Sequence, residues 1–178
     1  LIFSQAKKTS LVNIFPIGAI SKGLKGETLS DMGELKEAGC IAYSDDGRPV
    51  MDSELMRRAF EYSRMFGLPC IQHSEILDLT RDGCMNEGIV STELGLKGMP
   101  VEAEDIMVFR DISLLQKTGG RLHVAHISSG GAVDLVRQAK AKGLPVTCEV
   151  APHHFTLTEE ACRKYDTNSK MSPPLRTH

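Results

Sequence analysis

The sequence lacks several features that mark common functional classes. It has no excess of positive charge, because 21 Lys and Arg residues stand against 23 Asp and Glu residues, a net charge of −2. Proteins that neutralise a phosphate backbone carry such an excess, so we expect no nucleic-acid partner. No uncharged apolar stretch approaches the roughly 20 residues that span a bilayer, and the first residues do not resemble a signal peptide. We therefore expect a cytoplasmic protein without a membrane partner.

The sequence also lacks paired cysteines. Its five cysteines form no CxxC motif, and several lie inside apolar runs; they are Cys40, Cys70, Cys84, Cys148 and Cys162. A disulfide framework or a thiolate metal site would need paired cysteines at regular spacing. The pattern instead favours reduced, mostly buried thiols.

A unit repeats along the chain, consisting of an amphipathic segment, a glycine and a short apolar run. The expected helices are residues 30–38, 53–66, 103–118 and 132–142, and the apolar runs that follow them start at residues 40, 68, 122 and 146. Asp or Ser before such a segment and Gly after it are helix boundaries. Strands that alternate with helices favour right-handed βαβ units and a parallel sheet. Residues 11–20 are expected to supply a fifth strand.

No glycine-rich phosphate loop of the GxGxxG or GxxxxGK[ST] type follows any of these runs. A nucleotide-binding doubly wound sheet is therefore disfavoured. The remaining common architecture is the (β/α)8 TIM-type barrel, whose complete form needs about 250 residues. We expect residues 1–178 to be a partial barrel domain with roughly five of the eight βα units, and both ends of the full domain to lie outside the chain.

Acidic and histidine residues follow the expected strands at the point where each strand ends. Asp45 and Asp46 follow the first of the four runs, His73 follows the second, and His126 follows the third. The carboxyl ends of parallel strands form the edge where barrel enzymes place their chemistry. Carboxylate and imidazole are the ligands that catalytic zinc and related divalent ions prefer. The sequence therefore predicts a metal site, although Asp45-Asp46-Gly47 is also an ordinary turn signal and does not by itself separate Asp45 from Asp46.

Three other histidines have structural interpretations. Period-two alternation places His123 on the face of the strand opposite to His126, so we expect it to be structural. His153 and His154 follow a proline in an expected loop, and we expect them to pack or to support the site rather than to bind an ion.

The connection over residues 74–102 is long for a βα unit, where roughly 2–6 residues are usual. It is either an active-site wall or lid, or a surface excursion that packs on neighbouring units.

Several motifs together resemble one known family. They are Val12 to Ile20, the Ser44 to Val50 turn, Gln72-His73-Ser74-Glu75, Asn86-Glu87-Gly88, Val124 to Ser128, Thr147 to His154, and Pro173-Pro174-Leu175-Arg176. In this order and at this spacing they resemble dihydroorotases of the bacterial class I type, which belong to the metal-dependent amidohydrolase superfamily. The resemblance covers nearly the whole chain. It implies a distorted (β/α)8 barrel, in agreement with the repeating units.

The resemblance implies a role for individual residues. Asp46 would be the carboxylate that bridges two zinc ions, and His73 and His126 would be imidazole ligands of the second ion. Ser172 stands where the family commonly has an Asn that contacts substrate, and it can still form a hydrogen bond. In related hydantoinases a carboxylated Lys usually bridges the ions, but no Lys lies between Lys36 and Lys97. The family's His-x-His pair and substrate-binding Arg would lie upstream of the chain, and its proton-shuttling Asp downstream, so no catalytic residue is expected within it.

The function implied is a zinc-dependent cyclic amide hydrolase that interconverts dihydroorotate and N-carbamoyl-L-aspartate in pyrimidine biosynthesis. Two alternatives stay open. One is a hydantoinase- or allantoinase-like enzyme with the same metal chemistry, and the other is an inactive dihydroorotase-like scaffold for aspartate carbamoyltransferase. The expected ligand is a small-molecule substrate, and a homo-oligomer or a complex with aspartate carbamoyltransferase is left open.

Overall fold

The computed structural model describes residues 1–178 and is built around a four-stranded parallel sheet. Its strands lie in the order β1 (Tyr43–Ser44), β2 (Cys70–Gln72), β5 (Leu122–Val124) and β6 (Val146–Cys148). The pairing is in register across the sheet, so that Ile71 lies beside His123 and His123 beside Thr147. Each crossover between neighbouring strands contains a helix, as expected for βαβ units. The predicted α/β fold with a parallel sheet is confirmed.

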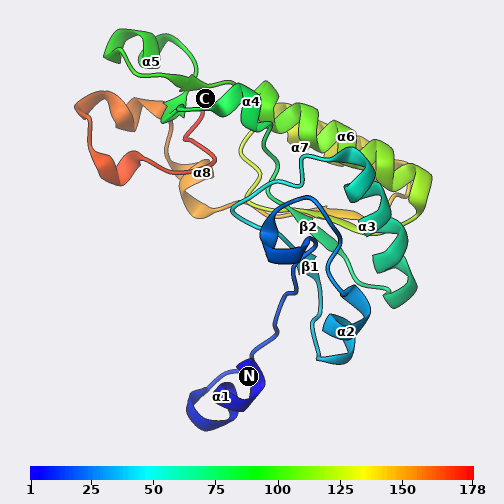
Figure 1. Ribbon diagram of the computed structural model, residues 1–178. Coiled ribbons are helices and arrows are strands. Elements are labelled where there is room, and N and C mark those ends of the chain that lie inside the picture. Colours follow the sequence, from blue (N-terminus) through cyan, green and yellow to red (C-terminus); the bar gives the residue numbers. More distant parts are fainter.

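Three long helices cover one face of this sheet (Figure 1). They are α3 (Ser53–Phe66), α6 (Glu102–Thr118) and α7 (Gly130–Ala141), and α6 packs against both of the others. The short helix α2 (Met32–Glu37) packs beside α3. The boundaries of α3 follow directly from the sequence, because the Asp52 side chain accepts a hydrogen bond from Leu55 N at 2.8 Å and Gly67 ends the helix with φ 67°.

The core lies between these helices and the sheet. It is one cluster of 18 buried residues that includes Tyr43 and Cys70 from the strands and Met56, Phe60 and Leu115 from the helices. Strand residues alternate between the two faces, so Cys70 and Gln72 are buried toward the helices while Ile71 between them is half-buried on the opposite face. The sheet therefore has one face packed by helices and one face that opens into cavities.

The predicted fifth strand over residues 11–20 is largely wrong. Only an isolated parallel bridge forms there, between Gly18 and Tyr43. Gly18 N donates to Ala42 O at 2.9 Å and Ile41 N donates to Pro16 O at 3.0 Å, but Pro16 has no N–H with which to extend the ladder. Helix α1 (Ile2–Thr9) precedes this segment, contains no buried residue and stands apart from the sheet (Figure 1).

The long connection after β2 contains structure of its own at the carboxyl edge of the sheet. It comprises α4 (Leu77–Thr80), β3 (Met85–Asn86), α5 (Ile89–Leu94) and β4 (Gly98–Met99), with β3 and β4 paired in parallel. It packs against the last segment of the chain, which contains α8 (Pro152–Thr156), η2 (Glu159–Lys164) and η3 (Thr167–Ser169). A further short turn of helix, η1 (Lys22–Leu24), follows the Gly18 bridge. Thr80 and Met99 also line a cavity, so the connection serves both as a wall and as a packing surface.

All five cysteines are free thiols, but they are less buried than the sequence suggested. Only Cys40 and Cys70 are buried, whereas Cys148 is exposed because β6 offers only Val146 to the core. None of the helices has the length and apolar character needed to cross a bilayer.

Candidate metal centre

Asp46, His73 and His126 come together at the carboxyl edge of the sheet. His73 Nδ1 lies 3.0 Å from His126 Nε2, and Asp46 Oδ1 lies 3.3 Å from His126 Nε2 and 3.7 Å from His73 Nδ1. The three residues follow β1, β2 and β5, which are neighbours in the sheet. Asp46 and His126 therefore meet although they are 80 residues apart in the sequence. Parallel pairing therefore explains why these side chains meet.

The chemistry of this donor set fits a divalent metal ion. His73 Nε2 lies 2.8 Å from a carboxylate oxygen of Glu75, so the Nε2 proton is directed to Glu75 and the Nδ1 lone pair faces Asp46 and His126. The hydrogen bond with His73 also holds the pKa of Glu75 below its usual value, although partial burial opposes it. Two imidazole nitrogens and a carboxylate oxygen form the N and O set that zinc accepts. The ligand atoms all lie within 4.8 Å of one another.

The structure separates the two adjacent aspartates that the sequence leaves equivalent. Asp45 is buried, and its carboxylate accepts hydrogen bonds from Ile20 N at 2.8 Å, Ser21 N at 3.0 Å and the Ser21 hydroxyl. Asp46 has a side chain that is 59% exposed, and its Oδ1 faces the two imidazoles. Asp45 therefore holds residues 20–21 against the turn that follows β1, while Asp46 is the carboxylate available to an ion.

His126 lies in an unusual backbone conformation. Its φ is 34°, in the left-handed region, which costs a residue with a Cβ about 1–2 kcal/mol. The flanking amides hold this turn to the sheet, since Ala125 N donates to Gln72 O at 3.1 Å and Ile127 N donates to Glu149 O at 2.8 Å. His126 Nδ1 is buried without a hydrogen-bond partner, while Nε2 is the atom that faces Asp46.

The prediction that His123 and His126 lie on opposite faces is wrong. Both line a cavity of about 570 Å³ on the open face of the sheet, together with Asp46. Period-two alternation ends with β5 at Val124, and the positive φ of His126 then turns its side chain back toward this cavity. His123 Nδ1 lies 2.8 Å from Thr147 Oγ1, and His123 is not among the residues that converge as ligands.

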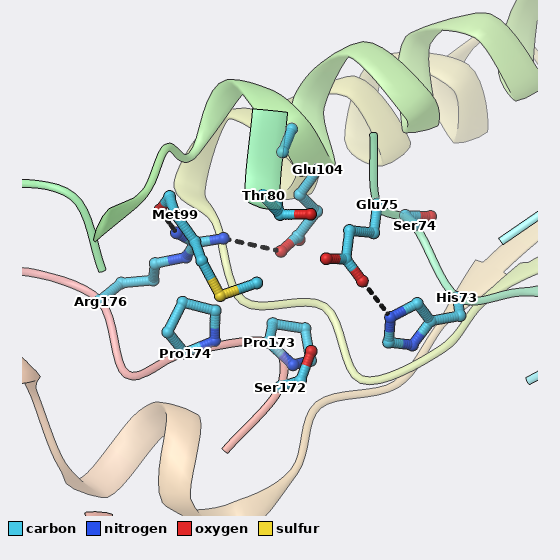
Figure 2. A pocket seen from close by; sticks show the side chains of 11 residues that line it. His73, Ser74, Glu75, Thr80, Met99, Glu104, Ser172, Pro173, Pro174 and Arg176 are labelled. Carbon is cyan, nitrogen blue, oxygen red and sulfur yellow. Dashed lines mark hydrogen bonds and ion pairs between the residues drawn. The ribbon is translucent and has the colours of Figure 1, made fainter. Parts of the chain in front are cut away.

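Ser172 lies beside a second, much smaller cavity of about 10 Å³, which has room for roughly one water molecule. Figure 2 shows Ser172 and Pro173 on one side of this cavity and the Glu75–His73 pair on the other. The carboxyl end of the chain thus brings Ser172 next to a candidate ligand far away in sequence. Ser172 is exposed and is therefore accessible to a small molecule.

The remaining histidines lie outside the converging group. His154 Nε2 lies 2.9 Å from Pro173 O, and the ring of His153 lies 4.3 Å from that of His154. Partial burial lowers the pKa of His154, which favours its neutral form. His154 thus contacts the segment that carries Ser172.

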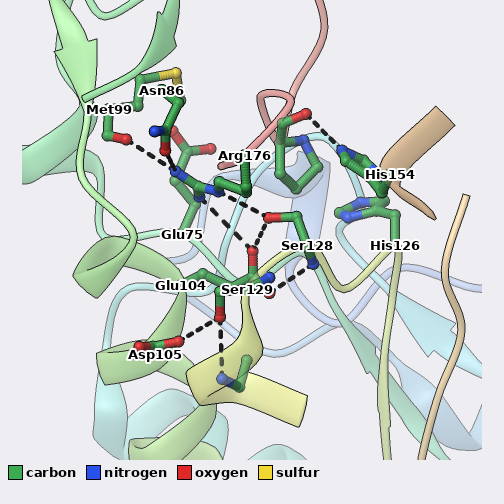
Figure 3. Close-up of polar contacts among 12 residues, drawn as sticks. Glu75, Asn86, Met99, Glu104, Asp105, His126, Ser128, Ser129, His154 and Arg176 are labelled. Atoms are coloured by element: carbon green, nitrogen blue, oxygen red, sulfur yellow. Dashed lines mark hydrogen bonds and ion pairs between the residues drawn. The ribbon is translucent and has the colours of Figure 1, made fainter. Parts of the chain in front are cut away.

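A buried polar network that was not predicted from the sequence lies beside the site, as Figure 3 shows. Arg176 donates to Asn86 Oδ1 at 2.9 Å, to Met99 O at 2.9 Å and to Ser128 Oγ at 3.1 Å, and Glu104 lies 3.8 Å from its guanidinium. Burial lowers the pKa of Arg176, and the nearby carboxylates oppose this shift. A signal existed for Glu104, because it occupies the same helical face as Met107, Val108 and Leu115, where a charged residue is unexpected.

Known proteins are similar to this chain in sequence over nearly its whole length. Residues 1–132 match the family described as dihydro-orotase-like. The chain is 61% identical over 176 residues to a dihydroorotase of Geobacter sp. (strain M21), and 60% identical over 176 residues to a dihydroorotase of Citrifermentans bemidjiense. Each match covers 99% of this chain, but the chain spans only 41% and 42% of the length of these curated relatives.

Solved structures of hydantoinases share the fold. A D-hydantoinase crystal structure matches with a TM-score of 0.75 at 22% identity, covering 98% of this chain and 41% of that chain. The L-hydantoinase from Arthrobacter aurescens matches with a TM-score of 0.74 at 18% identity, covering 93% of this chain and 38% of that chain. The fold is accordingly part of a (β/α)8 barrel of the amidohydrolase kind. With a family match over residues 1–132 and a parallel sheet of this architecture, the chain belongs to the dihydro-orotase-like family.

Proposed function

We propose that the intact protein is a zinc-dependent cyclic amide hydrolase that interconverts dihydroorotate and N-carbamoyl-L-aspartate in pyrimidine biosynthesis. The observation that carries the proposal is the convergence of Asp46, His73 and His126 at one edge of the sheet. The relatives named dihydroorotase, at 55–61% identity over nearly the whole chain, support the choice of substrate. In this proposal residues 1–178 are part of one barrel domain.

In this proposal Asp46, His73 and His126 would hold zinc, with Asp46 as the carboxylate ligand. Zinc bound there would supply a bound water of lowered pKa and a Lewis acid for the carbonyl to be attacked. Glu75 accepts a hydrogen bond from the Nε2–H of His73, which keeps the Nδ1 lone pair directed toward Asp46. The cavity that Asp46 and His126 line gives a small molecule access to them.

Ser172 is proposed as a substrate contact beside this site. Its hydroxyl can donate a hydrogen bond to a substrate carbonyl or accept one from a ring N–H. Arg176 fixes the backbone that follows Ser172, because its guanidinium is buried and bonded to β3, to β4 and to the turn after β5. By resemblance to the family, the proton for the leaving nitrogen comes from an aspartate outside this chain.

Replacement of Asp46 tests the proposal. In the intact protein, Asp46→Asn should remove most dihydroorotate turnover and lower the zinc content, because the amide is a poor ligand for the ion. Asp78→Asn is the matched control, since Asp78 is an exposed carboxylate that pairs only with Arg81. Turnover and zinc content in Asp46→Asn equal to those of Asp78→Asn would contradict the assignment.

Comparing substrates separates dihydroorotase from its alternatives. We expect turnover of dihydroorotate well above that of hydantoin and allantoin, which would be the preferred substrates of a hydantoinase- or allantoinase-like enzyme. No turnover of any of them, together with binding to aspartate carbamoyltransferase, would favour the scaffold. The presence of all three candidate ligands argues for the active enzyme.

We place the intact protein in the cytoplasm. Measurements of its molecular mass in solution, with and without aspartate carbamoyltransferase, would establish whether it forms a homo-oligomer or a complex with the transferase.

A further inference from the structure

Glu104 is a buried carboxylate whose partners almost all belong to one turn. It lies in the first turn of α6 and is 3% exposed. Ser128 N donates to Glu104 Oε1 at 2.8 Å, Ser129 N donates to the same oxygen at 3.1 Å, and the Ser128 hydroxyl donates to Glu104 Oε2. A buried carboxylate is costly unless it is hydrogen-bonded, and these three donors satisfy both of its oxygens.

The turn bound by Glu104 is the one that carries His126. Residues 125–129 connect β5 to α7, and His126 occupies the left-handed region with φ 34°. Such a conformation persists only where its surroundings determine it from several sides. The sheet holds one side through the amides of Ala125 and Ile127, and Glu104 holds the other through the amides that follow.

The neighbouring residue Asp105 strengthens the same attachment. The Ser129 hydroxyl donates to Asp105 and accepts a hydrogen bond from Ala132 N at 3.0 Å, so Ser129 is the N-cap of α7. Gly131 packs directly on the Asp105 carboxylate, with no room for a side chain. The first turns of α6 and α7 are therefore locked together immediately after His126.

Arg176 joins this turn to the segment that carries Ser172. Its Nε donates to Ser128 Oγ at 3.1 Å, and its Nη2 lies 3.8 Å from Glu104 Oε2. The Ser128 hydroxyl thus lies between the carboxylate and the guanidinium, donating to the first and accepting from the second (Figure 3). One buried charge pair consequently anchors both a candidate metal ligand and a candidate substrate contact.

We propose that Glu104 is a positioning residue that holds the 125–129 turn so that His126 Nε2 faces Asp46 and His73, with Arg176 attaching the Ser172 segment to the same anchor. The inference rests on the proposed function, because it takes the three converging residues to bind zinc. Glu104 lines the small cavity of about 10 Å³ beside Ser172, but it is neither one of the three converging ligands nor part of the lining of the cavity of about 570 Å³. Its effect is transmitted through the backbone of Ser128 and Ser129.

Zinc affinity of the intact protein, measured by competition with a chromophoric chelator, tests this role. Glu104→Gln should weaken zinc binding about 10- to 100-fold, the range found when a residue that orients a metal ligand is replaced. The visible spectrum of the cobalt-substituted protein should also change, because the position of His126 Nε2 alters. Glu102→Gln is the matched control, since Glu102 is exposed in the same helical turn and its charge also acts on Arg176. The zinc affinity of this control variant should stay within about twofold of that of the unaltered protein.

Ser128→Ala provides a second route if Glu104→Gln proves unstable. It removes only the hydroxyl between Glu104 and Arg176, and it should weaken zinc binding several-fold. The double variant should bind zinc little more weakly than Glu104→Gln alone, because both changes break the same hydrogen bond. Wild-type affinity and an unchanged cobalt spectrum in folded Glu104→Gln or Ser128→Ala would overturn the positioning role. Absence of zinc binding by the unaltered protein would instead overturn the proposed function.

Discussion

The helix-covered face of the sheet and its carboxyl edge differ in what keeps their side chains in place. The covered face is held by apolar packing, with Tyr43, Met56 and Phe60 fully buried. The carboxyl edge holds its side chains by polar contacts with individual partners, such as those of Asp45 and Glu104. Apolar burial is non-directional and tolerates adjustment, whereas each hydrogen bond depends on one geometry. The comparison predicts that changes on the covered face alter stability, while changes at the edge alter the site.

The largest effect is expected on the covered face, at Phe60. Phe60 is fully buried in the core cluster, so Phe60→Ala should lower the free energy of unfolding by about 3–5 kcal/mol. The zinc affinity of the molecules that remain folded should be unchanged. Urea denaturation and chelator competition on the same sample check both statements. A large loss of zinc affinity at low temperature would show that the two regions are not independent.

Much of the covered face could be predicted from sequence. The caps at Asp52 and Gly67 fix α3 to the residue, because each supplies a local interaction that depends only on its neighbours. The 11–20 strand failed for the opposite reason. An apolar run predicts burial, but a strand also needs consecutive donors and acceptors, and Pro16 interrupts them.

The carboxyl edge was predictable in composition but not in detail. The pattern of residues that end the strands was enough to identify His73, His126 and the Asp45-Asp46 pair as candidate ligands, since parallel strands end at a common edge. It could not separate Asp45 from Asp46, because their difference comes from the amides of residues 20–21. It also placed His123 and His126 on opposite faces, because the positive φ of His126 breaks the alternation after β5. Glu104 had a signal in its place among apolar residues of α6, but its partners Ser128 and Ser129 come next to it only in the fold.

The second prediction concerns the reactivity of the Cys70 thiol, which is buried on the covered face. Burial raises the pKa of Cys70 to about 12, so it is protonated as well as inaccessible. In the folded protein Cys70 should react with iodoacetamide at least about 100-fold more slowly than in urea, at pH 8 and at pH 9 alike. Mass spectrometry of the labelled peptide measures this ratio. Rapid labelling of Cys70 under native conditions would mean that this face opens more easily than its packing indicates.

A smaller difference in stability is expected between variants of the adjacent residues Asp45 and Asp46. Asp45→Asn replaces an acceptor-only carboxylate, bonded to three donors on Ile20 and Ser21, with an amide whose NH₂ faces a donor. We expect the free energy of unfolding to fall by about 2 kcal/mol, whereas Asp46→Asn should change it by less than about 0.5 kcal/mol. Thermal denaturation of the two variants side by side checks this order. Equal destabilisation would contradict the division of roles between them.

The smallest effect is expected at Ser172. Replacing it with Asn lengthens the side chain toward the cavity that it shares with His73 and Glu75. We expect a fall in KM for dihydroorotate of a few-fold, with little change in thermal stability, because Ser172 is exposed and one added hydrogen bond contributes about 1 kcal/mol. Steady-state kinetics of Ser172→Asn and Ser172→Ala would measure it. Identical KM values in both variants and the unaltered protein would remove Ser172 from the substrate site.

We propose that the edge formed by Asp46, His73 and His126 is the metal centre of a dihydroorotase. The most direct test of this proposal is dihydroorotate turnover by the intact protein, with zinc per chain determined on the same sample. We predict turnover together with bound zinc, and loss of both after chelation. Turnover that persists in zinc-free protein would contradict the metal assignment, and bound zinc with no turnover of dihydroorotate would contradict the substrate.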